Sequence, residues 1–280
     1  MSGWSFALSK RWFGYLALAV VFAIVCCLLG FWQLSRRADA RAEIDRLDAN
    51  YSSEPVPIAD VLETLDSFET NEKWTPVEIT GTYLSDEQVL VRNRPYNGSP
   101  GFDVLVPLQL ADGSVFIVDR GWVAPGNAQD SPDVIPEAPV GEVTVVARLK
   151  AGEPTIVGRS APAGQIATIH LPDLAERIGE PTFTGAYGLL ASESPAPASV
   201  PFAASKPERD EGPHLSYALQ WFVFAIMGFG GLAYALRQEY REVNAADPEE
   251  RERAEVRRVK REARAKTDAE IEDELVDAGR

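Results

Sequence analysis

Two long stretches of the chain contain no charged residue, and each is long enough to cross a membrane. The first runs from Trp12 to Ser35 and the second from Leu215 to Leu236. As α-helices they would extend about 36 Å and about 33 Å, against roughly 30 Å for the hydrocarbon core of a bilayer. Aromatic residues lie near the ends of both stretches, where amphipathic rings prefer the membrane interface. The pattern predicts transmembrane helices over residues 12–35 and 214–236.

The first stretch also resembles a cleaved signal peptide, but two features favour a retained span. Its apolar run is longer than the core of a usual signal peptide, which has about 7–15 residues. No small-x-small cleavage site follows it before Arg36 and Arg37. We therefore expect this helix to stay in the mature protein.

Between the two stretches the hydrophobic period changes from helical to two, which indicates strands. The predicted strands are rich in valine, isoleucine, threonine and aromatic residues, and turn residues separate them. They are Val77–Leu84, Gln88–Asn93, Asp103–Leu110, Val115–Val123, Glu142–Lys150 and Gln165–His170, with Phe183–Leu190 as a further strand. An Asp-Gly turn within 111–114 predicts a hairpin, and Leu171–Ile178 predicts a short helix with Pro172 in its first turn. Strands of this number and spacing are typical of a compact antiparallel barrel or sandwich.

Polar segments flank the strand-rich region. Residues 35–50 would continue the first helix, and the Pro- and Ser-rich residues 192–213 form a linker. Asp247 and Pro248 predict the start of a helix that continues to Glu274. The predicted fold class is therefore an α+β membrane protein. Its parts are a tail over 1–11, transmembrane helices over 12–35 and 214–236, an antiparallel β-rich domain, barrel- or sandwich-like, over 36–213, and a charged, partly helical tail over 237–280.

Two spans place both termini on one side of the membrane and residues 36–213 on the other. Short flanking segments that are rich in Lys and Arg usually face the cytoplasm. Within about 20 residues of the span ends, the distance over which this rule acts, each side carries six such residues. The charge pattern therefore leaves the orientation open.

Composition and motifs narrow the classes of function. The chain has 280 residues, with 27 Lys and Arg against 42 Asp and Glu and a net charge of −15, whereas nucleic-acid binding depends on surplus cations. The two cysteines are the adjacent Cys26 and Cys27, which excludes a disulfide framework and a CxxC site. Neither a G-x-S-x-G elbow nor a phosphate-binding glycine motif occurs. We expect a protein that is not an enzyme, and we interpret the sequence pair Asp119 and Arg120 as a structural ion pair.

The second span opens with a histidine that lies on a distinctive helix face. At 100° per residue, the residues within about 60° of His214 are aromatic or small. They are Tyr217, Ala218, Trp221, Ala225, Gly228 and Leu232. A flat apolar ring with a metal under the imidazole would suit this face. In the alternative interpretation His214 is an interfacial hydrogen-bonding residue, and the small residues let two helices pack.

Arg36 lies at the outer end of the first span, on the same helix face as Trp32. It would meet a carboxylate or a lipid phosphate beside His214, and ordinary lipid anchoring explains it equally well.

Three blocks of sequence, taken in order, resemble a known family. They are LGFWQLSRR over residues 29–37, a long block over 77–126 with R-N-R, P-G-F and R-G-W-V elements, and HLSYALQWFVFA over 214–225. The set is similar to the surfeit locus protein family, or Surf-one family, of cytochrome c oxidase assembly factors. The resemblance covers most of residues 12–236.

That resemblance implies an extracytoplasmic β-rich domain and both termini in the cytoplasm. The absence of an Arg- and Ser-rich transit segment favours a bacterial plasma membrane over an organelle. The resemblance also implies a part in maturing subunit I of a haem-a-containing oxidase, together with other oxidase assembly factors. A histidine that opens the second span has been linked to haem a in the family, and His214 matches it. We expect Tyr217, Trp221 and Arg36 to shape a transient haem a site around His214. The docking surface for the oxidase is expected to consist of Arg92, Arg94, Asp119, Arg120 and Trp122.

Two other functions remain as alternatives at this point. The first is a membrane-tethered structural or sensory domain whose charged tail recruits cytosolic partners. The second, an envelope hydrolase, has no support among the residues.

Overall fold

The computed structural model describes residues 3–127 and 131–262. Within it the chain divides into two compact units, one made of residues 1–38 and 212–280 and the other of residues 39–211. Each unit is described by itself. The predicted continuation of the C-terminal helix to Glu274 lies outside the described residues.

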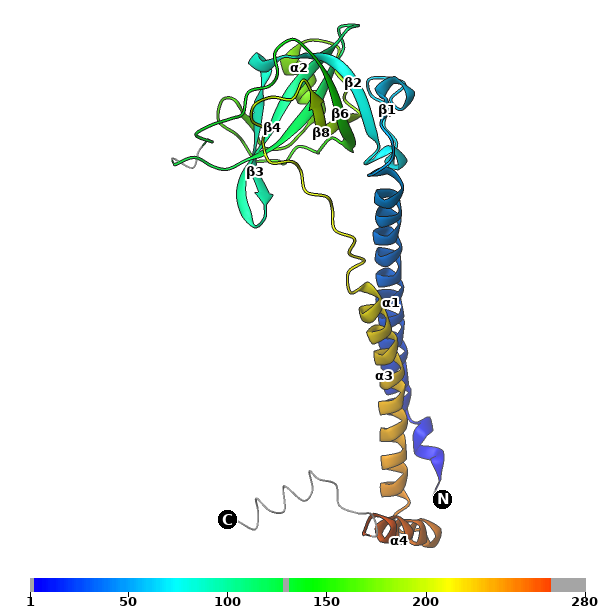
Figure 1. The fold of residues 1–280 in the computed structure, drawn as a ribbon. Coiled ribbons are helices and arrows are strands. Elements are labelled where there is room, and N and C mark those ends of the chain that lie inside the picture. Colours follow the sequence, from blue (N-terminus) through cyan, green and yellow to red (C-terminus); the bar gives the residue numbers. More distant parts are fainter. Residues whose placement is uncertain (1–2, 128–130, 263–280) are drawn as a thin grey trace. The chain divides into compact units, whose positions relative to one another are not determined.

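The first unit is a pair of long helices that run side by side (Figure 1). Helix α1 spans Lys10–Asn50, so its final turns belong to the second unit, and α3 spans His214–Val243. Glycines lie where the helices approach: a Cβ on Gly30 would be 2.8 Å from the ring of Phe222, and one on Gly228 would be 3.0 Å from the ring of Phe22. The small residues thus act here in helix packing.

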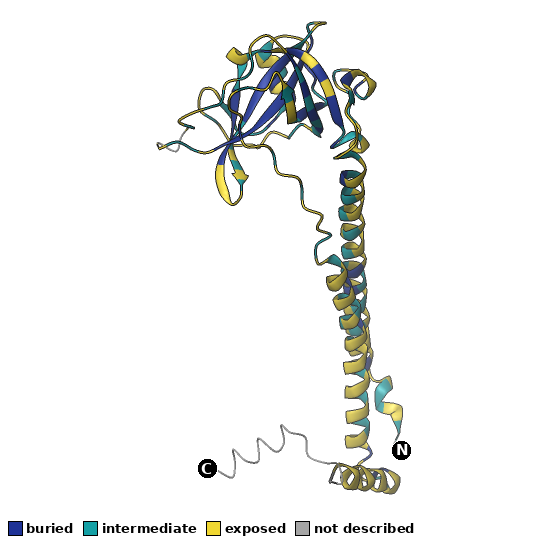
Figure 2. Cartoon of the chain, in the orientation of Figure 1, coloured by how far each residue is buried: buried dark blue, intermediate teal, exposed yellow. Residues whose placement is uncertain are grey.

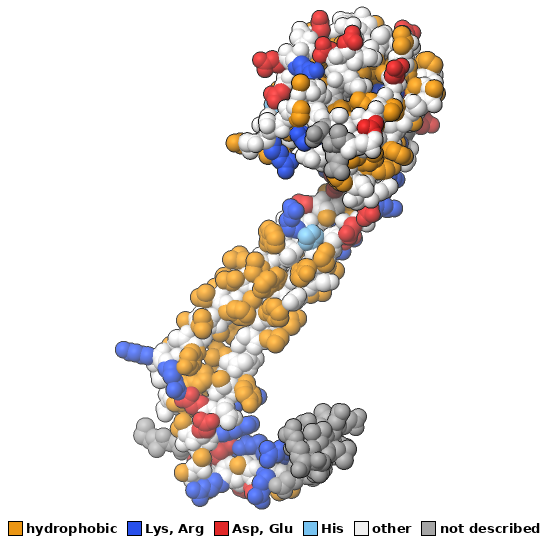
Figure 3. All heavy atoms as spheres, turned by 90° about the vertical axis from the view of Figure 1, so that its left-hand side faces the viewer, with side chains coloured by type: hydrophobic (Ala, Val, Ile, Leu, Met, Phe, Trp, Pro, Cys, Tyr) orange, Lys and Arg blue, Asp and Glu red, His pale blue; other side chains and the backbone are white. Residues whose placement is uncertain are grey.

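The surface of the helix pair is apolar over most of its length. Large exposed side chains include Leu18, Leu28 and Ile226, and Figure 3 shows hydrophobic atoms along the middle of the pair with charged side chains toward its ends. Both helices are long and apolar enough to cross a membrane. Contiguous apolar surface of this extent is unfavourable in water and suits a lipid environment.

Two short helices complete the described part of this unit, η1 over Trp4–Leu8 and α4 over Pro248–Glu262. The predicted cap of α4 is confirmed, because the Glu249 N–H donates to Asp247 Oδ1 at 2.9 Å. Pro248 occupies the first helical position, where its missing N–H costs nothing.

The second unit is built on one eight-stranded sheet. Its strands are β1 (Val56–Pro57), β2 (Pro76–Tyr83), β3 (Val89–Tyr96), β4 (Ser99–Leu110), β5 (Val115–Val123), β6 (Glu142–Ala151), β7 (Gln165–Ile166) and β8 (Ala186–Ser194). The other elements are the helix α2 (Leu171–Ile178) and the short turns η2 (Ile58–Asp60), η3 (Thr70–Glu72) and η4 (Ser85–Glu87).

The strands follow the order β1-β2-β6-β8-β5-β4-β3-β7, and β2 also pairs with β4. Strands β2, β6, β8, β5 and β4 therefore form a closed circuit of pairings. Most pairs are antiparallel, as predicted, but β1–β2, β3–β7 and β5–β8 are parallel. The expectation of a purely antiparallel sheet is wrong at these three short contacts.

Strand β5 lies at the centre of the core and is buried along its whole length (Figure 2). Phe116 and Val118 belong to one hydrophobic cluster. Val115 and Ile117 belong to a second cluster, which contains Leu171 and Leu174 of α2. Because alternate residues of a strand face opposite sides, β5 contributes to both clusters.

Several predicted boundaries shift. The strands predicted to end at Asn93 and begin at Asp103 extend to a tight turn at Asn97 and Gly98, both with positive φ. The strand predicted from Phe183 begins at Ala186 and reaches Ser194, inside the predicted linker. The strand predicted over 165–170 pairs only at Gln165 and Ile166.

Part of the linker is attached to the sheet. The Trp122 N–H donates to the Phe202 carbonyl at 2.7 Å, and the Phe202 N–H donates back at 2.8 Å. Gly121, with φ of 124°, makes this approach possible, because a Cβ there would lie 2.4 Å from the Phe202 carbonyl oxygen. Residues 192–213 are therefore not a wholly free tether.

Candidate functional site

His214 forms a hydrogen bond between the two long helices. Its Nδ1 lies 2.8 Å from Oε1 of Gln33, which is 181 residues away on α1. Because an amide oxygen only accepts, Nδ1 is the donor in this contact. The contact selects Nε2 as the nitrogen that is able to bind a metal.

The backbone of Gly212 lies close to Nε2 of His214. A Cβ on Gly212 would lie 3.2 Å from this nitrogen, and Gly212 has a positive φ of 66°. Glycine therefore keeps side-chain atoms away from the imidazole at that point. An imidazole that is held through Nδ1 has the chemistry of an axial haem ligand at Nε2, and a glycine is the residue that crowds this nitrogen least.

The helix face below His214 is not an open groove. Ala218 and Ala225 are buried, and Gly228 faces Phe22 of α1. Helix α1 thus packs against these small residues, as the alternative interpretation expected. Tyr217 is 49% exposed, and the half-buried Trp221 packs edge-to-face on Phe224 at 5.9 Å.

Arg36 lies three residues beyond Gln33 on α1 and is exposed. Residues at this spacing share a helix face. Arg36 is therefore close in sequence and in direction to the partner of His214.

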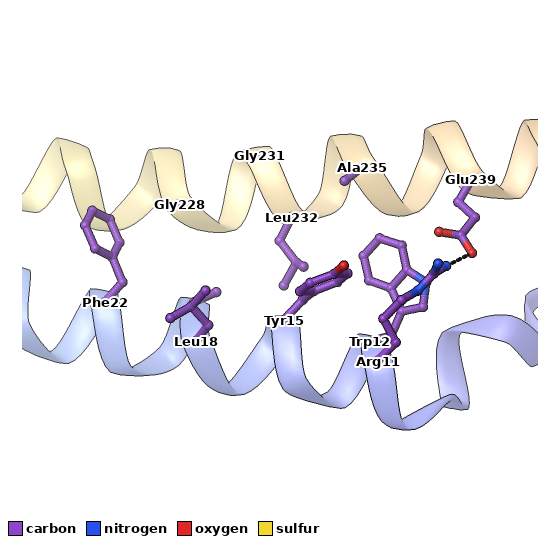
Figure 4. Close-up of a pocket in the computed structure, with 11 residues that line it drawn as sticks. Arg11, Trp12, Tyr15, Leu18, Phe22, Gly228, Gly231, Leu232, Ala235 and Glu239 are labelled. Carbon is purple, nitrogen blue, oxygen red and sulfur yellow. Dashed lines mark hydrogen bonds and ion pairs between the residues drawn. The ribbon is translucent and has the colours of Figure 1, made fainter.

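A cavity of about 650 Å³ lies between α1 and α3, toward the N-terminal end of α1. Figure 4 shows Trp12, Tyr15 and Phe22 against Gly228 and Gly231, with an ion pair of Arg11 and Glu239 at one end. Gly228 is 14 residues from His214 in sequence, which is about 21 Å along a helix. A ring bound through His214 would therefore not occupy this cavity.

In the second unit, Arg120 is a buried structural residue. Its guanidinium is 2.8 Å from Glu193 Oε1 and donates to the carbonyls of Pro136 at 2.9 Å and Glu137 at 3.2 Å. The Tyr83 hydroxyl donates to Glu193 Oε2 at 2.9 Å. Burial, together with the Glu193 carboxylate, raises the pKa of Tyr83 far above its usual value.

The sequence neighbours Asp119 and Arg120 do not pair with each other, contrary to the interpretation of an ion pair between them. Alternate residues of β5 point to opposite sides of the sheet. Asp119 Oδ1 accepts the Gly121 N–H at 2.9 Å, whereas Arg120 pairs with Glu193. The ion pair of Arg120 is real but has a different partner.

Trp122 and Arg94 are joined by a hydrogen bond. The indole Nε1 of Trp122 donates to the Arg94 carbonyl at 2.9 Å, and its ring stacks on Tyr96 at 5.1 Å. Gly101 lies under the indole, because a Cβ there would be 2.3 Å from the ring. Trp122 is buried and helps to hold the β3–β4 hairpin in place.

Arg94 bridges two carboxylates, Asp103 Oδ2 at 3.2 Å and Glu153 Oε2 at 2.6 Å. Burial acts to raise the pKa of Glu153, but hydrogen bonds from Arg94 and the Ile169 N–H lower it overall. Arg92 is half-buried, and its Nε is buried without an acceptor among the described residues.

The structure thus leaves few of the predicted docking residues accessible. Asp119, Arg120 and Trp122 are buried, while Arg92 and Arg94 are half-buried. Sequence reasoning missed Gln33, Asp103 and Glu153. The available signals were the polar Gln33 inside an apolar span, and Asp103 inside an otherwise apolar strand.

A family model described as the SURF1 family matches residues 20–226. The chain belongs to the SURF1 family. Uncharacterized SURF1-like proteins of Mycobacterium bovis and Mycobacterium tuberculosis are 33% identical over 252 residues, covering 87% of this chain and 91% of theirs. A SURF1-like protein of Rickettsia felis is 27% identical over 114 residues, covering 40% of this chain and 47% of its own.

SURF1 is a family of cytochrome oxidase assembly factors and not, in general, of enzymes. The matched region contains Gln33, His214 and every strand of the sheet. Helix α4 lies outside it. The chain has two helices that are long and apolar enough to cross a membrane, which is consistent with a membrane protein.

Proposed function

We propose that this SURF1 protein assists the maturation of subunit I of a haem-a-containing cytochrome c oxidase in a bacterial plasma membrane. In this proposal residues 36–213 are extracytoplasmic, both termini are cytoplasmic, and haem a is a transient cargo. Family membership supports the role in oxidase assembly. The proposed cargo site depends on the geometry around His214.

The contact between His214 and Gln33 is the observation that carries the proposal. Gln33 holds the imidazole by Nδ1, at 2.8 Å, and so presents Nε2 as an electron-pair donor to haem iron. Second-sphere hydrogen bonds of this kind commonly fix the tautomer and orientation of a ligating histidine. Gln33 is therefore proposed as a positioning residue.

A single protein ligand suits transfer better than permanent binding. Many stable haem proteins hold the iron by a histidine inside an enclosing pocket, whereas Tyr217 beside His214 is half exposed. Tyr217 and Trp221 would contact the apolar ring from α3. Arg36 would pair with an anionic group of the cargo or with a lipid phosphate.

Because most of the predicted docking residues are buried or half-buried, we propose a smaller docking surface. Arg92 and the exposed turn at Asn97 and Gly98 would contact the oxidase. Arg94 and Trp122 would hold that hairpin in shape, while Asp119 and Arg120 act from inside the sheet.

The test is the visible absorbance of the full chain, purified in detergent after co-expression with the enzymes of haem a synthesis. We expect bound haem a in wild type and loss of at least tenfold in His214→Gly, with recovery when free imidazole is added. Gln33→Leu should bind several-fold less haem and shift the absorbance maximum. Gln220→Leu, an exposed glutamine on α3, is the matched control.

Full haem occupancy in His214→Gly without imidazole would remove the ligand assignment. Normal oxidase haem content in cells that lack the gene would remove the assembly role.

A further inference from the structure

A second cavity lies wholly within the second unit, apart from the helix pair. It has a volume of about 230 Å³, room for about seven water-sized groups. Its walls come from β3, β4, β5, β6, β8, the linker and the segment before β2. The residues that matter here are Trp74, Asp103, Asp119, Trp122, Lys150 and Tyr187.

The walls of this cavity carry two carboxyl groups, Asp103 and Asp119, and two cations, Arg94 and Lys150. Glu153 is not a wall residue, but it pairs with Arg94 at 2.6 Å. Arg94 is occupied by Asp103 and Glu153. Lys150 forms no ion pair within 4 Å in the described part of the chain, and its Nζ lies 5.8 Å from the ring of Tyr187.

Asp119 is the carboxyl group with the fewest partners. It is 4% exposed, and among the described residues it accepts one hydrogen bond, from the Gly121 N–H. The burial of a carboxylate without a cationic partner is costly, so such a group either keeps its proton or acquires a cation.

Tyr187 gives an independent indication of a ligand. It is 1% exposed and borders the cavity, yet its hydroxyl makes no hydrogen bond to any residue that the structure describes. Buried hydroxyl groups nearly always have a partner. The missing partner of Tyr187 would therefore lie in the cavity.

The chemistry of the walls selects the kind of ligand. The described residues contain no group of three His, Cys, Asp or Glu side chains arranged for a metal ion. The two carboxyl groups in the walls, of which Asp119 has no cationic partner within 4 Å among the described residues, disfavour an anion. Aromatic walls from Trp74, Trp122 and Tyr187 favour an organic cation.

We propose that this cavity binds a primary ammonium group, carried by a small amine or by the lysine side chain of a protein partner. An ammonium has three donors, and the carboxylates of Asp103 and Asp119 with the hydroxyl oxygen of Tyr187 provide three acceptors. The site does not depend on the proposed haem role, because no residue of the helix pair borders it.

Binding should be coupled to the release of a proton. Burial raises the pKa values of both Asp103 and Asp119; the charge of Glu153 adds to the rise at Asp103, and the charge of Asp103 adds to the rise at Asp119, so the empty cavity retains a proton. The ammonium replaces that proton: the acid ionises, the carboxylate pairs with the cation, and one proton goes to solvent. The other charged groups that face the site are Arg94, Lys150 and Glu153, with Tyr187 as a neutral phenol. Lys206 of the linker is directed to Tyr51, at 4.7 Å from its ring.

The experiment is calorimetric titration of the full chain in detergent with n-butylammonium chloride near pH 7, with proton release followed in weakly buffered solution. We expect saturable binding with release of up to one proton, and binding of tetramethylammonium at least tenfold weaker because it has no donors. A capped Gly-Lys-Gly peptide identifies the source: tighter binding of the peptide indicates a partner lysine, and tighter binding of butylammonium indicates a free amine.

Two variants and a control test the assignment. Asp119→Asn should weaken binding at least tenfold and abolish proton release. Tyr187→Phe should weaken it several-fold while proton release remains. Glu78→Gln removes an exposed carboxylate of the same sheet and should bind as wild type. Absence of saturable binding to wild type would overturn the proposal. So would wild-type affinity in both Asp119→Asn and Tyr187→Phe, with their circular dichroism unchanged.

Discussion

The carboxyl group of Asp119 shows how one residue can make stability depend on pH. Burial, and then the nearby Asp103, raises its pKa from 3.8 to about 8. The folded chain therefore binds more protons than the unfolded chain between these values. In that interval the free energy of unfolding falls as pH rises.

Asp119→Asn should remove this dependence, because an amide does not titrate. The fold should be retained, because the amide oxygen is still able to accept the Gly121 N–H. We expect the free energy of unfolding of the variant, relative to that of wild type, to rise by at least about 1.4 kcal/mol between pH 5 and pH 9, the equivalent of one pKa unit. Urea unfolding of the full chain in detergent, followed by tryptophan fluorescence, measures the difference. A constant difference across this pH range, or the same gain in Glu78→Gln, would contradict the assignment.

The ion pair of Arg120 and Glu193 is a second feature at this scale. Removal of one partner leaves an uncompensated buried charge, which typically costs about 3–5 kcal/mol. We expect Arg120→Met to lose stability in that range. Arg41→Met is the control, because the exposed pair of Arg41 and Glu211 should contribute less than about 1 kcal/mol. Equal losses in the two variants by urea unfolding would show that burial does not matter here.

At the scale of residues, the sequence indicated which segments carry clustered polar side chains but not which of these side chains pair with one another. The block VDRGWV correctly marked a dense polar site. The partner of Arg120 lies 73 residues away, and Glu153 lies 59 residues from Arg94. Such contacts depend on strand order, which no local pattern encodes.

At the scale of elements, local patterns predicted strands and helices well where burial and turns agreed. The bounds Val115–Val123 and Leu171–Ile178 match β5 and α2. The β3–β4 hairpin is longer than predicted and includes Pro95 and Pro100, a residue type that is unusual within paired strands. The Asn-Gly pair at 97 and 98 was nonetheless a turn signal for that hairpin.

The attachment of the linker at Gly121 gives a prediction for an element. Gly121→Ala should displace Phe202 from β5, because the added Cβ meets the Phe202 carbonyl. We expect the segment 192–213 to be cleaved several-fold faster in limited proteolysis. Gly113→Ala is the matched control, since Gly113 also has positive φ but nothing within 4 Å of its Cβ. Equal cleavage of both variants would show that backbone strain, and not the lost contact, governs the segment.

At the scale of the molecule, the two apolar helices were predictable from length alone, but their direction through the membrane was not. Six basic residues flank the spans on each side, so the distribution of Lys and Arg does not favour either orientation. The strand-rich region was predictable as a sheet. Its order and parallel contacts follow from packing between distant segments.

The proposed orientation can be tested with single cysteines in a Cys26→Ala, Cys27→Ala background. Ser99 and Ala246 are both exposed, one in the β3–β4 hairpin and the other before α4. We expect a membrane-impermeant maleimide to label Ser99→Cys in intact cells and Ala246→Cys only after permeabilisation. The reverse pattern would place the sheet in the cytoplasm and exclude the proposed function.

The closed circuit of strand pairings also restricts how another polypeptide is able to attach. The outermost strands, β1 and β7, have two residues each, and β3 beyond Val91 carries a bulge near Asn93 and then Pro95. Short, interrupted margins offer little template for an incoming strand. A partner of this sheet would therefore contact its side chains and not extend it through backbone hydrogen bonds, and the same margins protect the domain from indiscriminate β-aggregation.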